Sequence, residues 1–239
     1  MRAVDQAHGL LRLSAAVELI GRRARGSSPV RWPLLVPGLF GLAVFAALTV
    51  YATGHHYMPF DVDFERAVQR VRWGSMTNVF SAFDWLEGPR QDIAGAAVLI
   101  LLIAFNWRSA PLVLTTAAGA TAIYYVTELA LKRPRPSAGL VNVVRHTGDY
   151  SFPSGHVVFF TWCVVLPVVC IVAGRVPRPV AALAWAIAAL AILIACTGRI
   201  YLGEHWPSDV IAGLALGLGW TAVALSVRKL SNPVLARST

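Results

Sequence analysis

Residues 179–198 read PVAALAWAIAALAILIACTG, a stretch of twenty positions without one charged side chain. An α-helix needs roughly 20 mostly apolar residues to cross the hydrocarbon core of a bilayer. Arg178 and Arg199 flank the stretch, so the charges stand at its two ends. The stretch therefore predicts a membrane-spanning helix.

Five further stretches lack Asp, Glu, Lys and Arg: 32–60, 93–107, 109–127, 157–174 and 210–227. Of the 239 residues, 56% are hydrophobic and only 14% are charged, and the mean hydropathy is +0.61, which makes lipid the expected solvent. The stretch 93–107 would cover only about 22 Å as a helix. It must recruit flanking residues such as Gly88 and Pro89, or thin the bilayer locally. We predict an all-α integral membrane protein with about six transmembrane helices.

The chain divides into three regions. Residues 1–31 are basic and predict either an amphipathic helix on the cytoplasmic membrane surface or a disordered tail. Residues 32–229 form the membrane domain, in which 54–91 is the longest connection. The spaced aromatic residues of 54–91 indicate short helices at the outer interface. Residues 230–239 are predicted to be a cytoplasmic tail.

The net charge of +9 raises the question of nucleic acid, but the basic residues form no patch. They stand at the ends of the apolar stretches, where Lys and Arg favour the cytoplasmic side. More than half of the 21 basic residues fall in the N-terminal segment, in alternate loops and in the tail: Arg2, Arg12, Arg22, Arg23, Arg25, Arg31, Arg108, Arg175, Arg178, Arg228, Lys229 and Arg237. We predict a multi-pass protein of the cell membrane with both termini cytoplasmic and no nucleic-acid partner. The sequence does not predict an oligomeric state.

Three segments at the other ends of the spans carry polar and charged residues: KRPRP at 132–136, PSGH at 153–156 and RIYLGEHWPSD at 199–209. They close the third span, open the fourth, and link the fifth to the sixth. Because a chain that threads a membrane alternates direction, all three fall on one face. The sequence therefore predicts one shared site on the extracytoplasmic side.

The residue types in this site are suited to binding phosphate. Ser154 can cap the fourth span, so that the backbone N–H groups of Gly155 and His156 point at an anion with the helix dipole behind them. Arg135 and Arg199 add planar guanidinium groups that bind phosphate oxygens in pairs.

Two histidines can supply the chemistry. His205 and Asp209 are four residues apart at the start of a helix, so the carboxylate can accept the Nδ1 proton and leave Nε2 free to attack. His156 supplies a second imidazole that can protonate the departing oxygen. Singly, such residues are ordinary at span ends, where they mark topology. Together on one face they favour a phosphoryl-transfer site.

At these residues the chain resembles the type 2 phosphatidic acid phosphatase superfamily, in particular its membrane lipid phosphatase branch. Pro-Ser-Gly-His stands unbroken at 153–156, and the third motif is present at 198–209 with Gly198 in place of its leading Ser. The likeness spans about residues 90–227 and implies a phosphohistidine on His205, oriented by Asp209, with His156 as general acid. It implies that Ser154, Gly155, Arg135 and Arg199 hold phosphate, and it implies no metal or other cofactor.

The first motif of the family departs at one position. Arg135-Pro136 matches its end, but Glu128 stands seven residues earlier, where the family has Lys. Lys132, one turn further on, can take over the phosphate contact, as can Arg133. Alternatively, Glu128 pairs with Lys132 or contacts a hydroxyl or amine of the substrate.

The sequence thus predicts hydrolysis of a phosphorylated lipid. The substrates considered are a polyprenyl diphosphate, phosphatidylglycerophosphate, phosphatidate and a polyprenyl-phospho-sugar. One alternative is a phosphotransferase that passes the phosphoryl group from the same intermediate to an acceptor other than water. Another is a catalytically weak lipid-binding protein, a reading that Glu128 favours.

Overall fold

The computed structural model describes residues 28–145 and 150–235, and every regular element in these ranges is a helix. The helices are α2 Trp32–Ala52, α3 Asp61–Arg70, α4 Met76–Trp85, α5 Pro89–Phe105, the 3₁₀ turn η1 Trp107–Ser109, α6 Ala110–Leu131, α7 Gly155–Pro167, the π-helical turn η2 Val168–Val172, α8 Arg178–Tyr201, α9 Pro207–Ser226 and α10 Arg228–Leu235. The prediction for residues 1–31 lies almost wholly outside the described residues.

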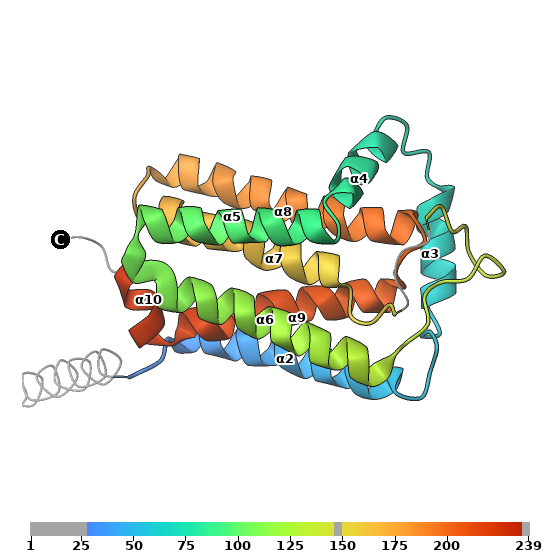
Figure 1. Cartoon of the computed structure of the whole chain (residues 1–239), viewed down its shortest axis with the longest axis horizontal. Helices are drawn as coiled ribbons and strands as arrows, with labels where there is room; N and C mark the ends of the chain where they lie inside the picture. Colours follow the sequence, from blue (N-terminus) through green and yellow to red (C-terminus); the bar gives the residue numbers. More distant parts are fainter. Residues whose placement is uncertain (1–27, 146–149, 236–239) are drawn as a thin grey trace, which may run out of the picture.

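The helices α2, α5, α6, α7, α8 and α9 run along the long axis of the molecule (Figure 1). Five spans in the described residues are long and apolar enough to cross a membrane: α2, α8, α9, the continuous run of η1 with α6, and that of α7 with η2. Helix α5 has 17 residues and reaches membrane length only together with α4, from which it is bent by 79°. It begins at Pro89, so it does recruit residues before the apolar stretch. The predicted all-α fold with about six membrane helices is confirmed.

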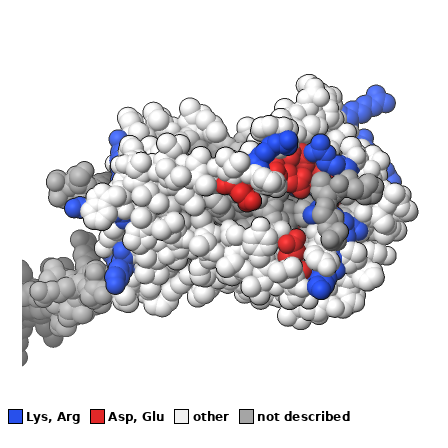
Figure 2. All heavy atoms as spheres, in the orientation of Figure 1, with Lys and Arg blue, Asp and Glu red and all other residues white. Residues whose placement is uncertain are grey.

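Large apolar side chains cover the outside of these helices. Phe40 on α2 is 72% exposed, Ile100 on α5 is 66% exposed and Leu193 on α8 is 61% exposed. On the face drawn in Figure 2, Lys and Arg lie toward the two ends of the bundle, and the surface between them is uncharged apart from an acidic group near its middle. Apolar side chains exposed in this number need lipid around them.

Helix α9 is packed in the middle of the bundle through glycines. A Cβ added at Gly219 would lie 3.0 Å from the Gly38 carbonyl oxygen of α2, and one at Gly217 would lie 2.7 Å from Cβ of Thr161 on α7. Small residues permit such close approach of helix backbones, which is how helices associate in membranes. Helix α9 is therefore held directly against the backbone of α2 and the side chains of α7.

The two ends of the bundle differ. At one end the described termini meet, because the Arg31 N–H donates to the Ser226 carbonyl (2.7 Å) and the Arg228 N–H donates to the Pro29 carbonyl (3.0 Å). Residues 228–235, which include the start of the predicted tail, form α10 at this end (Figure 1). At the other end lie the short helices α3 and α4 of the 54–91 connection.

Candidate active site

The three predicted segments meet at the end of the bundle that carries α3 and α4. The Ser151 N–H donates to the Arg133 carbonyl (2.9 Å), and the Ser154 N–H donates to the Asp209 carbonyl (3.0 Å). These two backbone bonds join the segments after α6, before α7 and before α9. The structure therefore brings together the segments that the sequence places on one face.

His205 is buried, and both of its ring nitrogens have partners. Its Nδ1 lies 2.7 Å from the Ser151 carbonyl oxygen, and its Nε2 lies 3.3 Å from Nη1 of Arg135. A carbonyl oxygen only accepts, so Nδ1 carries the proton and Nε2 presents a lone pair toward the guanidinium. This is the tautomer that a nucleophilic imidazole requires.

The structure corrects one expected contact. Asp209 was expected to accept the Nδ1 proton of His205, but its Oδ2 lies 3.9 Å from that nitrogen. Oδ2 instead accepts hydrogen bonds from the Trp206 N–H (2.9 Å) and the Ser151 hydroxyl (2.8 Å). The reason is local: Asp209 is the third residue of α9, and its side chain reaches back to the N-cap residue, Trp206.

A buried polar network lies beneath the histidine. Arg133 forms an ion pair with Asp209 and another with Asp61 on α3, the latter at 3.2 Å. Asp61 also accepts hydrogen bonds from the N–H (2.8 Å) and hydroxyl (2.6 Å) of Ser208. Arg133 donates its remaining Nε–H to the His56 carbonyl (3.0 Å), so this guanidinium is committed to the fold.

Burial controls the charge of His205. It lowers the pKa of His205 well below the ordinary 6.5, and nearby Arg135 and Arg199 lower it further, against the opposite effect of the Ser151 carbonyl. His156 also contributes to lowering this pKa. His205 is therefore neutral at physiological pH.

His156 stands in the first turn of α7 and contacts α4. Its Nε2 donates to the Phe83 carbonyl (3.1 Å), while its Nδ1 is buried and has no hydrogen-bond partner within the described residues. The imidazole packs against Phe160, with ring centroids 4.8 Å apart. In this expected general acid, Nε2 is therefore held by the backbone, and Nδ1 has no hydrogen-bond partner in the described residues.

The buried guanidinium of Arg199 lies among three carboxylates. Its Nη1 lies 2.9 Å from Asp84 and 3.9 Å from Glu87, and it forms an ion pair with Glu204. Asp84 forms a further ion pair with Arg145. These three carboxylates are close enough to hold a metal ion, and in this structure the cations that contact them are Arg199 and Arg145. Substrate phosphate would have to compete with the carboxylates for Arg199.

The start of α7 differs in detail from the expectation. The Ser154 side chain caps no backbone N–H, and its buried Oγ has no partner among the described residues. Gly155 lies directly under a tyrosine, because a Cβ added there would be 2.6 Å from Cζ and 2.9 Å from the hydroxyl oxygen of Tyr124. A glycine is therefore required at this position.

Lys132 lies apart from this cluster. It ends α6 with a left-handed backbone, is exposed, and borders a small cavity of about 190 Å³ with His55 and His56. Its neighbour Arg133 is the one that points into the protein. Glu128 forms no ion pair with Lys132 in the described chain, and its carboxylate interacts electrostatically with the Tyr124 hydroxyl.

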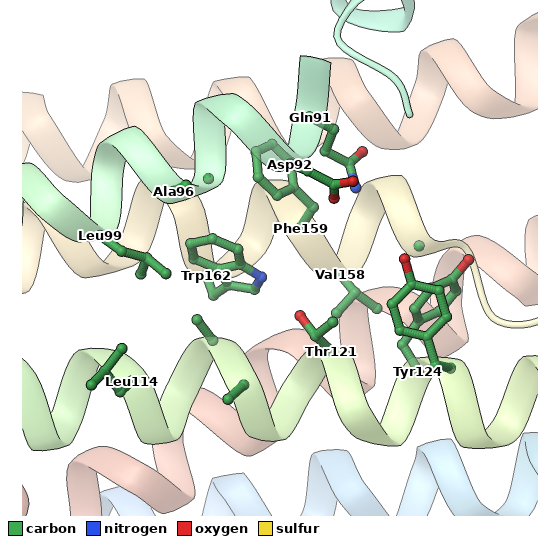
Figure 3. A pocket seen from close by; sticks show the side chains of 15 residues that line it. Gln91, Asp92, Ala96, Leu99, Leu114, Thr121, Tyr124, Val158, Phe159 and Trp162 are labelled. Atoms are coloured by element: carbon green, nitrogen blue, oxygen red, sulfur yellow. The ribbon is translucent and has the colours of Figure 1, made fainter. Parts of the chain in front are cut away.

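An apolar groove of about 300 Å³ adjoins the start of α7, between α5, α6 and α7. Figure 3 shows Gln91 and Asp92 on one wall, Thr121 and Tyr124 on the other, and Trp162 between the walls. Of the polar side chains in the lining, Tyr124 lies against Gly155, and most of the other lining residues are apolar. The volume and lining of the groove suit a hydrocarbon chain.

Sequence reasoning missed several residues of the site. Asp61, Phe83 and Asp84 belong to the 54–91 connection, and their distance along the chain from the motifs conceals their contacts. Ser151 acts through its carbonyl, for which no side-chain signal exists. Tyr124 stands one turn before Glu128, and that spacing was the one signal available.

Comparison with known proteins agrees with this geometry. The model of the PAP2 superfamily matches residues 109–233. No match to a curated protein sequence reaches significance. The fold resembles a crystal structure of the transmembrane PAP2-type phosphatidylglycerolphosphate phosphatase from Bacillus subtilis, with a TM-score of 0.58 and 22% identity over 81% of this chain and 94% of that one.

LpxE from Aquifex aeolicus is also similar, with a TM-score of 0.54 and 22% identity over 70% of this chain and 96% of that one. At these identities the structural likeness concerns the fold. The family model, however, spans more than half of the chain and includes the segments after α6, before α7 and before α9. The chain belongs to the PAP2 superfamily and has the fold of its transmembrane phosphatases.

Proposed function

We propose that this protein is a membrane phosphatase that hydrolyses a phosphomonoester or diphosphate of a lipid through a phosphohistidine on His205. The observation that carries the proposal is the setting of this imidazole. Its proton is held by the Ser151 carbonyl, and its Nε2 lone pair faces Arg135. A neutral imidazole beside a guanidinium is suited to attack a phosphate that the guanidinium binds.

In the first step, Nε2 of His205 forms a bond to phosphorus and the bond from phosphorus to the lipid oxygen breaks. His156, as an imidazolium, gives a proton to that oxygen. Its Nε2–H is held by the Phe83 carbonyl, so Nδ1 is the atom that delivers the proton. The phosphate enters as a monoanion and supplies this proton to Nδ1, which balances the charge of the step.

In the second step, neutral His156 takes a proton from water as the water oxygen attacks phosphorus. The bond from phosphorus to Nε2 breaks, His156 returns its proton to the phosphate, and inorganic phosphate leaves as a monoanion with both imidazoles neutral again. Arg135 and the N–H groups of Gly155 and His156 neutralise the developing charge in both steps. Asp209 acts indirectly, by holding the segment of Ser151 against His205.

The lipid nature of the substrate rests on the groove. Its apolar lining adjoins Gly155, so a phosphate at the start of α7 and a hydrocarbon chain in the groove fit one molecule. The bundle around it exposes apolar side chains to lipid. A substrate drawn from the bilayer therefore needs no separate route through water.

The orientation is proposed from the basic residues. Arg31, Arg175 and Arg228 lie near the end where the described termini meet, opposite α3 and α4. The bias of Lys and Arg toward the cytoplasm then puts this end inside and the site on the extracytoplasmic side of the cell membrane.

The test is to trap the intermediate. Purified protein in detergent is mixed with a lipid phosphate labelled with ³²P at the phosphoryl group and quenched in alkali, in which phosphohistidine survives. Label is expected on the wild type and not on His205→Ala. His156→Ala should still bind lipid, with a rate lower by about 10²- to 10⁴-fold. Turnover by His205→Ala above roughly a tenth of wild type contradicts the mechanism.

A further inference from the structure

The structure adds a pair of residues to the site at the junction between the groove and the start of α7. The Tyr124 ring covers Gly155, and Glu128 stands one turn further along α6, where its carboxylate interacts electrostatically with the Tyr124 hydroxyl. Tyr124 also lines the groove. Any substrate with its phosphate at Gly155 and its chain in the groove must pass this pair.

The pair presents acceptors. The Glu128 carboxylate offers only acceptor oxygens, and the Tyr124 hydroxyl oxygen can accept as well. Across the groove stand Gln91 and Asp92 (Figure 3). Neither Asp92 nor Glu128 forms an ion pair with a described residue.

Arg135 interacts electrostatically with Tyr124 and Glu128, but the guanidiniums near this junction are engaged with other groups. The described lining of the groove contains no Lys, Arg or His. Arg135 donates to the Glu204 carbonyl (2.7 Å) and contacts His205, and Arg199 is paired with carboxylates. In a lipid diphosphate, the terminal phosphate that reacts can use these guanidiniums. The inner phosphate, which lies nearer the groove, would face Tyr124, Glu128 and Asp92. Such a group would be anionic among acceptors and carboxylates.

We propose that Tyr124 and Glu128 determine specificity, and that they select lipid monophosphates with a hydroxyl or ammonium donor one or two carbons from the ester oxygen. The donor binds the phenol oxygen and the carboxylate while the phosphate binds at Gly155. A diphosphate is disfavoured, because its inner phosphate occupies the same place. This inference rests on the proposed phosphatase function and narrows its substrate class.

The experiment measures kcat/KM of the purified full chain in one detergent, at equal mole fractions of each lipid. Octadecyl phosphate has no donor, lysophosphatidate has a free 2-hydroxyl, and sphingosine 1-phosphate has a 2-ammonium group. Farnesyl phosphate and farnesyl diphosphate share a chain and differ by one phosphate. A hydrogen bond to a charged group predicts that the two donor-bearing lipids exceed octadecyl phosphate by about 10- to 100-fold. Farnesyl phosphate should exceed its diphosphate.

Variants assign the preference to the pair. Glu128→Gln and Tyr124→Phe are expected to reduce the ratio of donor-bearing lipids to octadecyl phosphate to less than about threefold. Tyr51→Phe and Asp63→Asn are the matched controls, because Tyr51 stacks on His55 and Asp63 is exposed on α3. Glu128→Lys should raise hydrolysis of farnesyl diphosphate relative to farnesyl phosphate. A variant that is merely unstable cannot produce that gain.

The outcomes separate the two proposals. If none of the five lipids is hydrolysed, the phosphatase function and the selectivity are both wrong. If all are hydrolysed at similar kcat/KM, or if the ratios are unchanged in Glu128→Gln, Tyr124→Phe and Glu128→Lys, the phosphatase function stands and the selectivity is wrong.

Discussion

His205 is oriented by a backbone carbonyl, that of Ser151, which lies 2.7 Å from its Nδ1. The motif carboxylate, Asp209, holds the segment that supplies this carbonyl and neutralises Arg133. The Ser151 carbonyl therefore orients His205, whereas Asp209 balances the charge of Arg133 beneath it. The predictions below make use of that separation.

Asp209→Asn should chiefly destabilise the protein. It leaves the buried Arg133 with one fewer counter-charge, and loss of one partner of a buried ion pair costs about 3–5 kcal/mol. Ser151→Ala keeps the carbonyl that holds His205 and should reduce kcat by less than about tenfold while lowering stability by ~1 kcal/mol. Thermal unfolding and kcat in the same detergent measure both. If Ser151→Ala is as inactive as His205→Ala, the hydroxyl has a direct role that the geometry does not give it.

The lowered pKa of His205 predicts that its imidazole remains neutral as the pH falls through 6.5. The unfolded chain takes up a proton there and the folded chain does not, so this group's contribution to stability decreases below pH 6.5. The measurement is NMR of labelled histidine side chains between pH 5 and 8, with His205→Ala to identify the signal. A titration midpoint near 6.5 for that signal contradicts the effect of burial.

Glu65 on α3 predicts an opposite pH dependence. Its carboxyl is buried without a hydrogen-bond partner in the described residues, and burial, with Asp61 and Asp209, raises its pKa from 4.5 to about 9. Between these values the folded state holds a proton that the unfolded state has released, so this contribution to stability is lost as pH rises.

Glu65→Gln imitates the protonated carboxyl and should raise Tm relative to wild type more at pH 8 than at pH 5. A gain of ~1 kcal/mol corresponds to about 2–4 °C for a chain of this size. Asp63→Asn, at an exposed position of the same helix, is the control. A constant difference in Tm at both pH values would show that the native carboxyl is ionised.

Orthovanadate should inhibit and EDTA should not. Vanadate adopts the trigonal bipyramid of the transferring phosphoryl group, and transition-state analogues bind more tightly than substrates. The cation among Asp84, Glu87 and Glu204 is the guanidinium of Arg199, so chelation removes nothing that these residues need. Phosphate release with and without each reagent is the assay. Loss of activity in EDTA, with recovery on adding a divalent ion, would show that these carboxylates hold a metal ion and are not simply ion-pair partners of Arg199.

The orientation predicts which surfaces an impermeant thiol reagent reaches in intact cells. In a version with Cys163, Cys170 and Cys196 replaced by Ala, Gly139→Cys beyond α6 should be labelled, and Asn232→Cys on α10 should be labelled only after lysis. Both positions are exposed and lie toward opposite ends of the bundle. The reverse labelling pattern would place the site in the cytoplasm.

The spans could be predicted from the sequence because lipid offers the backbone no hydrogen-bond partners. An uncharged stretch such as 179–198 then has one stable form, a helix, and α8 runs from Arg178 to Tyr201. The weak case was also foreseeable, since 93–107 was too short and α5 starts at Pro89. The pattern does not predict the 79° bend between α4 and α5.

The site was predictable only in part. Alternating direction of the spans is enough to bring Arg135, His156 and His205 to one end. It does not say that Ser151 would supply the carbonyl under His205, or that Asp84 would occupy Arg199. Those contacts depend on where loops and short helices pack, and neither spacing nor charge in the sequence encodes that.

The glycine packing of α9 has a mechanical consequence. The helix starts two residues after His205, and Gly217 and Gly219 bring it against its neighbours with no flexible side chain between them. At these two glycines, sliding of α9 would drive its backbone against its neighbours, so we expect α9 to change its depth in the membrane only together with the bundle. Bundles adjust their depth and tilt to the thickness of the bilayer. We therefore expect membrane thickness to set the height of His205 relative to the lipid headgroups.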